Sequence, residues 1–207
     1  MKTVLCYGDS NTWGSVPAET TRYDIHTRWP GVMRDLLGEG YWIIEEGLPG
    51  RTTSFDDPVE GAHKNGMTYL YPCLESHNPL DLVIIMLGTN NLKQRFSSSA
   101  YDIAQSAGLL VHTTNQGING IKPKVLLVCP PPIGRLTHYA EMFAGADEKS
   151  QWLASHYARV ADELKCTFFN AGDVIRSSDR DGIHLEAEAH STLGGSLASV
   201  VRDILAD

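Results

Sequence analysis

Ser10 is a candidate nucleophile because it follows a short apolar run and lies between glycines, in the sequence Tyr-Gly-Asp-Ser-Asn-Thr-Trp-Gly at residues 7–14. Such a turn can present a hydroxyl at the end of a strand, with its own backbone N–H alongside. The same residues also fit a turn that binds a phosphate or caps a helix. However, a P-loop needs Lys followed by Ser or Thr after its last glycine, and Gly14 is followed by Ser15 and Val16. GxGxxG is absent, and Thr12 stands where the nucleophile elbow GxSxG needs glycine.

A serine nucleophile needs a base, and His184 is the histidine with an aspartate three positions before it, Asp181. A carboxylate at that spacing can hold the imidazole and fix its tautomer while the other ring nitrogen faces a serine. The ordinary alternative is a turn at Asp181–Gly182, with His184 capping the last helix.

Acyl transfer also needs hydrogen-bond donors at the developing oxyanion. Gly50 can bring a backbone N–H close to a ligand, and Asn90 can donate from its side-chain amide. Each site alone also fits a Gly- and Asn-rich turn. Together, the four turns supply a nucleophile, a base, its orienting group and oxyanion donors.

Four ordered blocks, Gly8-Asp9-Ser10, Gly50, Gly88-x-Asn90 and Asp181-x-x-His184, resemble those of the SGNH (GDSL-like) hydrolase superfamily. The surrounding sequence resembles its bacterial arylesterases and acyltransferases, and the blocks span nearly the whole chain. The resemblance implies a flavodoxin-like sandwich with Ser10 as nucleophile, His184 as base and Asp181 as its partner. It also implies an oxyanion hole formed by Ser10, Gly50 and Asn90.

Two positions depart from the family pattern. Asn91 stands where Asp is common; if this position braces the first turn, the neutral Asn91 must do so by a different hydrogen-bond pattern. Asn11 stands where Leu is common, which makes that edge of the pocket more polar. We expect Asp9, Asn11, Trp13 and Ile183 to contact the substrate, although Trp13 is equally suited to the core.

The elements that must position these residues follow an alternating pattern. Strands are expected at residues 3–7, 42–45, 82–87, 124–129 and 166–170. Helical periodicity follows at residues 29–37, 103–111, 152–164 and 193–204, and Ser99 with Asp102 forms a possible capping pair. This alternation predicts one domain over residues 1–207, an α/β fold with a three-layer α/β/α sandwich around a parallel five-stranded sheet. The proposed functional turns then lie at the carboxyl ends of strands or just before the last helix.

The Pro-rich run at residues 130–132 opens a segment to about residue 149 that we expect to be an irregular loop. Its apolar residues can form a lip over the site, an oligomer contact or a small additional core. They are Ile133, Leu136, Tyr139, Met142 and Phe143.

Composition narrows the class of protein. The formal charge is −8 and no basic cluster occurs, which argues against a nucleic-acid partner. The apolar runs are too short to span a bilayer, and the amino-terminal run resembles a first strand rather than a signal peptide. The four cysteines stand apart without a CxxC pair, which favours reduced thiols and a cytoplasmic protein.

The sequence thus predicts an esterase for short-chain or aryl carboxylic esters, with small-molecule substrates, no cofactor, no metal site and no membrane partner. Alternate positions such as those of His184, Glu186, Glu188 and His190 spread around a helix and do not converge on an ion. Family relatives imply homo-oligomerisation and acyl transfer to alcohols. A carbohydrate O-deacetylase with the same triad is the alternative enzyme. A flavodoxin-like binding module and an inactive scaffold are the non-enzymatic alternatives.

Overall fold

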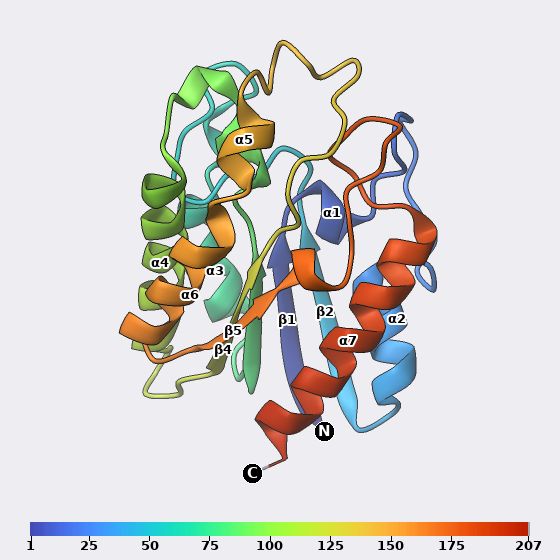
Figure 1. Ribbon diagram of the computed structural model, residues 1–207. Coiled ribbons are helices and arrows are strands. Elements are labelled where there is room, and N and C mark those ends of the chain that lie inside the picture. Colours follow the sequence, from blue (N-terminus) through green and yellow to red (C-terminus); the bar gives the residue numbers. More distant parts are fainter. Residues whose placement is uncertain (207) are drawn as a thin grey trace.

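The computed structural model describes residues 1–206, and its centre is a five-stranded parallel sheet (Figure 1). The strand order is β2-β1-β3-β4-β5. The strands are β1 (Lys2–Gly8), β2 (Tyr41–Gly47), β3 (Leu82–Met86), β4 (Lys124–Cys129) and β5 (Thr167–Asn170). All five expected strands are present, with ends shifted by at most two residues.

Two helical layers cover the sheet (Figure 1). On one face, α2 (Trp29–Leu37) packs beside α7 (Ala187–Leu205). The other face carries α3 (Gly66–Ser76), α4 (Ala100–Gln116) and α6 (Leu153–Glu163). The predicted flavodoxin-like α/β/α sandwich is therefore confirmed.

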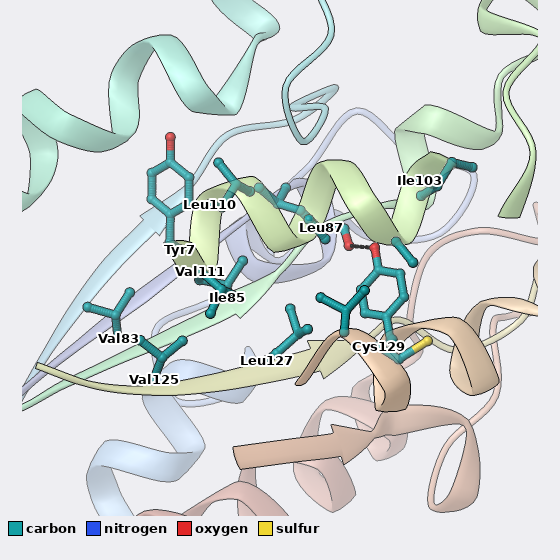
Figure 2. Packing of buried hydrophobic residues seen from close by; sticks show 14 of the residues in the cluster. Tyr7, Val83, Ile85, Leu87, Ile103, Leu110, Val111, Val125, Leu127 and Cys129 are labelled. Atoms are coloured by element: carbon teal, nitrogen blue, oxygen red, sulfur yellow. Dashed lines mark hydrogen bonds between the residues drawn. The ribbon is translucent and has the colours of Figure 1, made fainter. Parts of the chain in front are cut away.

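Side chains alternate between the two faces because successive strand residues point in opposite directions. Val4 and Cys6 of β1 enter the core under α2 and α7, whereas Leu5 and Tyr7 enter the core under α3, α4 and α6. Figure 2 shows this second core, where side chains of β3 and β4 meet those of α4. Both faces are apolar, as expected of a parallel sheet covered on both sides.

Three helices differ from the prediction. The single helical turn α1 (Ser10–Trp13) and α3 lie outside the expected helical segments, and the expected loop after residue 130 ends in α5 (Ala146–Ser150). The periodic pattern of α3 is weak because Tyr69 and Tyr71 stay exposed and Pro72 lies inside the helix. The expected pair at the start of α4 is present, since Ser99 and Asp102 form a reciprocal capping box.

The strand order creates a switch point between β1 and β3, where ligands bind in open α/β sheets. The chain leaves β1 toward β2 and leaves β3 toward β4, so the loops diverge and open a crevice. Gly8 at the end of β1 pairs in register with Gly47 of β2 and Met86 of β3. The turns that follow these three strands are thereby brought together at one edge of the sheet.

Within the described residues, none of the helices is both long enough and apolar enough to cross a membrane. In the same part of the chain, all four cysteines are unpaired; Cys6, Cys73 and Cys129 are buried and Cys166 is half-buried.

Candidate active site

Ser10 is the first residue of α1 (Ser10–Trp13), a single helical turn directly after β1. The preceding residue, Asp9, caps this turn by accepting a hydrogen bond from the backbone N–H of Asn11 at 3.0 Å. Gly14 ends the turn in the left-handed conformation. The short helix thereby holds the Ser10 hydroxyl at the carboxyl edge of the sheet.

His184 and Asp181 complete a hydrogen-bonded chain to this hydroxyl. Nε2 of His184 lies 3.1 Å from Oγ of Ser10, and Nδ1 of His184 lies 2.7 Å from Oδ2 of Asp181. Both distances are within hydrogen-bonding range, although 174 residues separate Ser10 from His184. The arrangement can draw a proton from the serine and stabilise the imidazolium that results.

The Asp181 carboxylate is fully buried but well supplied with donors. Its Oδ1 atom accepts the backbone N–H groups of Ile183 and His184, both at 2.9 Å, and Oδ2 also accepts the N–H of Ala18 at 2.9 Å. Burial opposes ionisation, but the hydrogen bonds from His184 and the backbone outweigh it and hold the pKa of Asp181 well below its usual range. Asp181 is therefore an anion at neutral pH, fixed in position beside the imidazole.

Gly50 and Asn90 lie at the same cavity as Ser10 and His184. Gly50 has a φ of +80°, and a Cβ there would come within 2.4 Å of a Glu60 carboxylate oxygen, so the turn requires glycine. Nδ2 of Asn90 donates to the main-chain oxygen of Arg51 at 3.1 Å, and its distance to Oδ2 of Asp9 is 3.4 Å. The longer contact is the weaker one.

Gly88 fixes the approach of the chain to Asn90. Its φ is +131°, and a Cβ at this position would come within 2.3 Å of the Tyr157 hydroxyl. That hydroxyl donates to the main-chain oxygen of Leu87 at 2.7 Å, the bond drawn as a dashed line beside Leu87 in Figure 2. Tyr157 of α6 thus supports the end of β3 just before the Asn90 turn.

The cavity has a volume of about 240 Å³, which is small for a ligand site. Tyr139, Met142, Phe143 and Ile183 form an apolar wall. The first three belong to the segment expected as a loop after residue 130, so that segment does form a lip at the site. Phe143, Ile133 and Leu136 of the same segment also pack in the core, so the lip and the additional core are one structure.

The remaining wall is charged and carries Glu19, Glu60, Lys64 and Lys93. Lys93 is almost fully buried and pairs with Glu60 and with the buried Asp57. Arg95 also pairs with Asp57, at 2.9 Å. Nζ of Lys64 donates to the main-chain oxygen of Pro49 at 2.8 Å. These pairs fix charged groups beside the Gly50 turn.

Three residues expected to contact the substrate are not among the residues that line the described cavity. Asp9 is buried below it, and burial raises the pKa of Asp9 to about 6, against the opposing effect of the Asn11 N–H. Asn11 instead donates to the main-chain oxygen of Ile183 at 3.1 Å. The Trp13 ring stacks with the Arg22 guanidinium. Ile183, the fourth residue expected to contact the substrate, does line the cavity.

Asn91 braces a different turn from the one expected. Its Oδ1 atom accepts the N–H of Thr53 at 3.0 Å, and its Nδ2 atom donates to Oγ1 of Thr53 at 2.9 Å. The neutral amide therefore stabilises the turn that carries Gly50 rather than the turn that carries Ser10. An amide suits this role because it offers one acceptor and one donor.

The charged wall was missed by sequence reasoning. Glu60 comes shortly before a 3-10 turn (Ala62–Lys64) that ends at Lys64 and precedes α3, and no spacing in the sequence marked either residue. Lys93 comes three residues after Asn90, the side chain expected to donate to the oxyanion. This closeness in sequence was the signal that could have indicated a place for Lys93 at the site.

Comparisons with known proteins find esterases among the proteins that this chain resembles. The model of the GDSL-like lipase/acylhydrolase family matches residues 6–191. An acetylxylan esterase from Xylanibacter ruminicola is 24% identical over 96% of this chain. The chain spans 43% of the length of that relative.

Solved structures of similar length cover the whole fold. A carbohydrate acetylesterase from Sinorhizobium meliloti is 46% identical and superposes with a TM-score of 0.95 over 99% of this chain and 100% of its own. The aryl esterase of M. smegmatis is 42% identical, with the same TM-score and the same coverage of both chains.

Proposed function

The chain belongs to the GDSL-like lipase/acylhydrolase family and is a carboxylic ester hydrolase, and from that premise we propose that Ser10 carries the acyl group during hydrolysis of short-chain and aryl esters. The observation that carries the proposal is the hydrogen-bonded chain Asp181–His184–Ser10 opening into a small cavity.

In the first half-reaction, Nε2 of His184 accepts the Ser10 proton as Oγ attacks the ester carbonyl. Asp181 keeps the other ring nitrogen protonated and stabilises the imidazolium. His184 then donates its proton to the leaving alcohol, and the acyl group remains on Ser10. In the second half-reaction, water attacks the acyl group and gives its proton to His184; the bond to Ser10 breaks, the carboxylic acid leaves, and His184 returns the proton to Oγ of Ser10.

The oxyanion is stabilised by the backbone N–H groups of Ser10 and Gly50 and by the side chain of Asn90. One Asn90 hydrogen is engaged by the Arg51 oxygen, whereas the other makes only the 3.4 Å contact with Asp9. We assign this second hydrogen to the oxyanion, because giving up the long contact with Asp9 costs little free energy.

The two walls of the cavity differ in chemistry, and each suits a different part of an ester substrate. The apolar wall with Tyr139, Met142 and Phe143 suits a short acyl chain or an aryl group, and the volume of about 240 Å³ disfavours long chains. The opposite wall, with Glu60 and Lys64, suits an alcohol that carries hydroxyl groups. This wall favours a carbohydrate O-deacetylase as the second candidate, in line with the similarity to a carbohydrate acetylesterase.

We further propose that small alcohols can replace water in the second half-reaction, that the chain forms homo-oligomers, and that it works in a reducing compartment such as the cytoplasm. Exposed Tyr101, Leu109 and Trp152 on the outer layer supply apolar surface for self-association. The proposal of a reducing compartment is supported by the cysteines of the described residues, which are unpaired. Light scattering across a dilution series tests the oligomer.

The substrate proposal is tested by comparing kcat/KM for p-nitrophenyl acetate, butyrate and octanoate with that for an acetylated xyloside. We expect a steep fall from butyrate to octanoate; preference for octanoate would contradict the small acyl site. Phe143→Ala and Glu60→Gln separate the two candidates. A loss with Glu60→Gln that is confined to the xyloside favours the deacetylase, and a loss with Phe143→Ala that is confined to aryl esters favours the arylesterase.

A further inference from the structure

Three side chains with metal-binding atoms meet outside the esterase cavity, between the end of β2 and the end of α3. They are Glu46 of β2, Cys73 in the last turn of α3, and His77, which caps that helix. One carboxylate oxygen, the sulfur and one imidazole nitrogen all lie within 4.8 Å of one another. None of the three lines the esterase cavity, and the proposed mechanism uses none of them.

Local structure brings the three together. Cys73 and His77 are four residues apart, and the main-chain oxygen of Cys73 accepts the N–H of His77 at 3.1 Å, so both side chains lie on one face of the last turn. That face lies against the end of β2, where Nε2 of His77 is 3.0 Å from Oε1 of Glu46. Cys73 is buried, while the side chains of Glu46 and His77 are 21% and 25% exposed, so an ion can reach the cluster from solvent.

We propose that Glu46, Cys73 and His77 bind one Zn²⁺ ion, with water in the fourth position. Zinc binds sulfur, nitrogen and carboxylate oxygen at about 2.0–2.3 Å in tetrahedral geometry, which separates ligand atoms by about 3.3–3.8 Å. The three atoms lie within 4.8 Å of one another, and Nε2 of His77 is 3.0 Å from Oε1 of Glu46, so small rotations of the two partly exposed side chains can complete the arrangement. Mg²⁺ and Ca²⁺ are disfavoured because they bind oxygen ligands almost entirely.

Binding replaces the contacts of the metal-free cluster. The Cys73 thiol releases its proton to solvent and binds as thiolate, and His77 exchanges its contact with Glu46 for the metal. The two anionic ligands balance the charge of Zn²⁺. The Arg51 guanidinium, which donates to the main-chain oxygen of Glu46, adds a positive charge nearby. We therefore expect weaker binding than in closed four-ligand zinc sites.

The ion would stabilise the fold rather than take part in ester cleavage. Arg51 donates to the main-chain oxygens of Gly8 and Glu46 and so ties β1 and β2 to the turn after Gly50. An ion bound by both Glu46 and Cys73 would link α3 to β2, and through Arg51 to β1 and the turn after Gly50. The expected effect is a higher Tm with zinc and an unchanged requirement for Ser10.

The test titrates Co²⁺ into the untagged, chelator-treated full chain and follows thiolate-to-cobalt charge-transfer absorption, which only a bound cysteine produces. We expect saturation at one Co²⁺ per chain, loss of the band on adding Zn²⁺, and a zinc-dependent rise in Tm. Cys73→Ser should abolish the band, and His77→Gln should weaken binding at least tenfold. Cys166→Ser, the control at another cysteine, should leave the band unchanged.

A folded wild type without the band would overturn the proposal, as would a band that survives Cys73→Ser or disappears in Cys166→Ser. Circular dichroism and hydrolysis of p-nitrophenyl acetate report whether each variant is folded. If Cys73→Ser does not fold, His77→Gln and Glu46→Gln decide the question, because both alter partly exposed side chains. Unchanged cobalt affinity in these two variants would then refute the site.

Discussion

Asn91 holds Thr53 by two hydrogen bonds, one to its backbone N–H at 3.0 Å and one to its hydroxyl at 2.9 Å. These two bonds join the turn after β3, which carries Asn90, to the turn after β2, which carries Gly50. Both proposed donors outside the Ser10 turn thus belong to one hydrogen-bonded unit. Activity should therefore depend on Asn91, although it does not line the cavity.

Asn91→Leu should lower both stability and activity. The buried N–H of Thr53 loses its partner, which costs about 1–3 kcal/mol in the free energy of unfolding. Displacement of the Gly50 turn should lower kcat by about tenfold to a hundredfold. Urea unfolding and p-nitrophenyl acetate kinetics measure the two effects. Asn91→Asp keeps the acceptor for the Thr53 N–H and should retain most of the activity; an equally severe loss in Asn91→Asp would contradict this role.

Asp181→Asn should lower kcat by about 10⁴-fold at neutral pH, the size of the effect known for the equivalent change in a serine protease triad. The new amide can donate to Nδ1 of His184 and so favour the tautomer that carries its proton on Nε2, which cannot accept the Ser10 proton. Asp179→Asn, an exposed position two residues earlier, is the control and should behave as wild type. A modest loss in Asp181→Asn would show that the carboxylate does not set the tautomer.

Asn90→Ala should lower kcat by about 10²–10³-fold with little change in KM, because the missing donor acts on the oxyanion rather than on the bound ester. Asn115→Ala is a matched control: it also removes a hydrogen bond from an amide to a main-chain oxygen, at Leu164, but away from the cavity. If Asn90→Ala raised KM alone, Asn90 would be a ground-state binding residue.

His190 makes stability depend on pH. It is fully buried, its Nδ1 atom accepts the N–H of Trp29 at 3.2 Å, and its Nε2 atom has no hydrogen-bond partner in the described residues. Burial lowers the pKa of His190 to about 3 from an ordinary value of 6.5. Between these pH values the unfolded chain holds the proton and the folded chain does not, so stability falls as pH drops from 6.5 toward 3.

His190→Gln keeps an acceptor for the Trp29 N–H but does not titrate. The free energy of unfolding of the variant relative to wild type should therefore rise on going from pH 7 to pH 4, by about 3 kcal/mol at most. Urea unfolding at several pH values measures this difference. His63→Gln, at an exposed position, should show no such trend. A parallel pH dependence in wild type and His190→Gln would refute the assignment.

The fold could be predicted, and the residues proposed to react could be selected, because their signals are local. Each strand is a short apolar run, and Ser10, Gly50, Asn90 and His184 each follow or precede such an element. The charged wall of the pocket could not be predicted in the same way. Glu60 and Lys93 come from two separate segments, and only the packed tertiary structure brings them to one cavity. Tyr139 differs, because a lip over the site was one of the expected roles of its segment.

Asp9, Asn11 and Trp13 illustrate the opposite difficulty. They lie near Ser10 in sequence, but the Asp9 side chain caps the turn, Asn11 donates to the main-chain oxygen of Ile183 and Trp13 stacks with Arg22. Nearness in sequence does not reveal these partners. The cluster of Glu46, Cys73 and His77 could likewise not be predicted from the sequence. Its residues come from β2 and from the end of α3, and α3 has no clear periodic pattern.

Intact-mass analysis after treatment with a fluorophosphonate tests whether Ser10 forms the acyl-enzyme. We expect one adduct on the wild-type chain together with loss of p-nitrophenyl acetate hydrolysis. We also expect no adduct and negligible turnover for folded Ser10→Ala. Labelling of Ser10→Ala to the same extent as wild type, or wild-type turnover that persists after complete labelling, would contradict this role of Ser10.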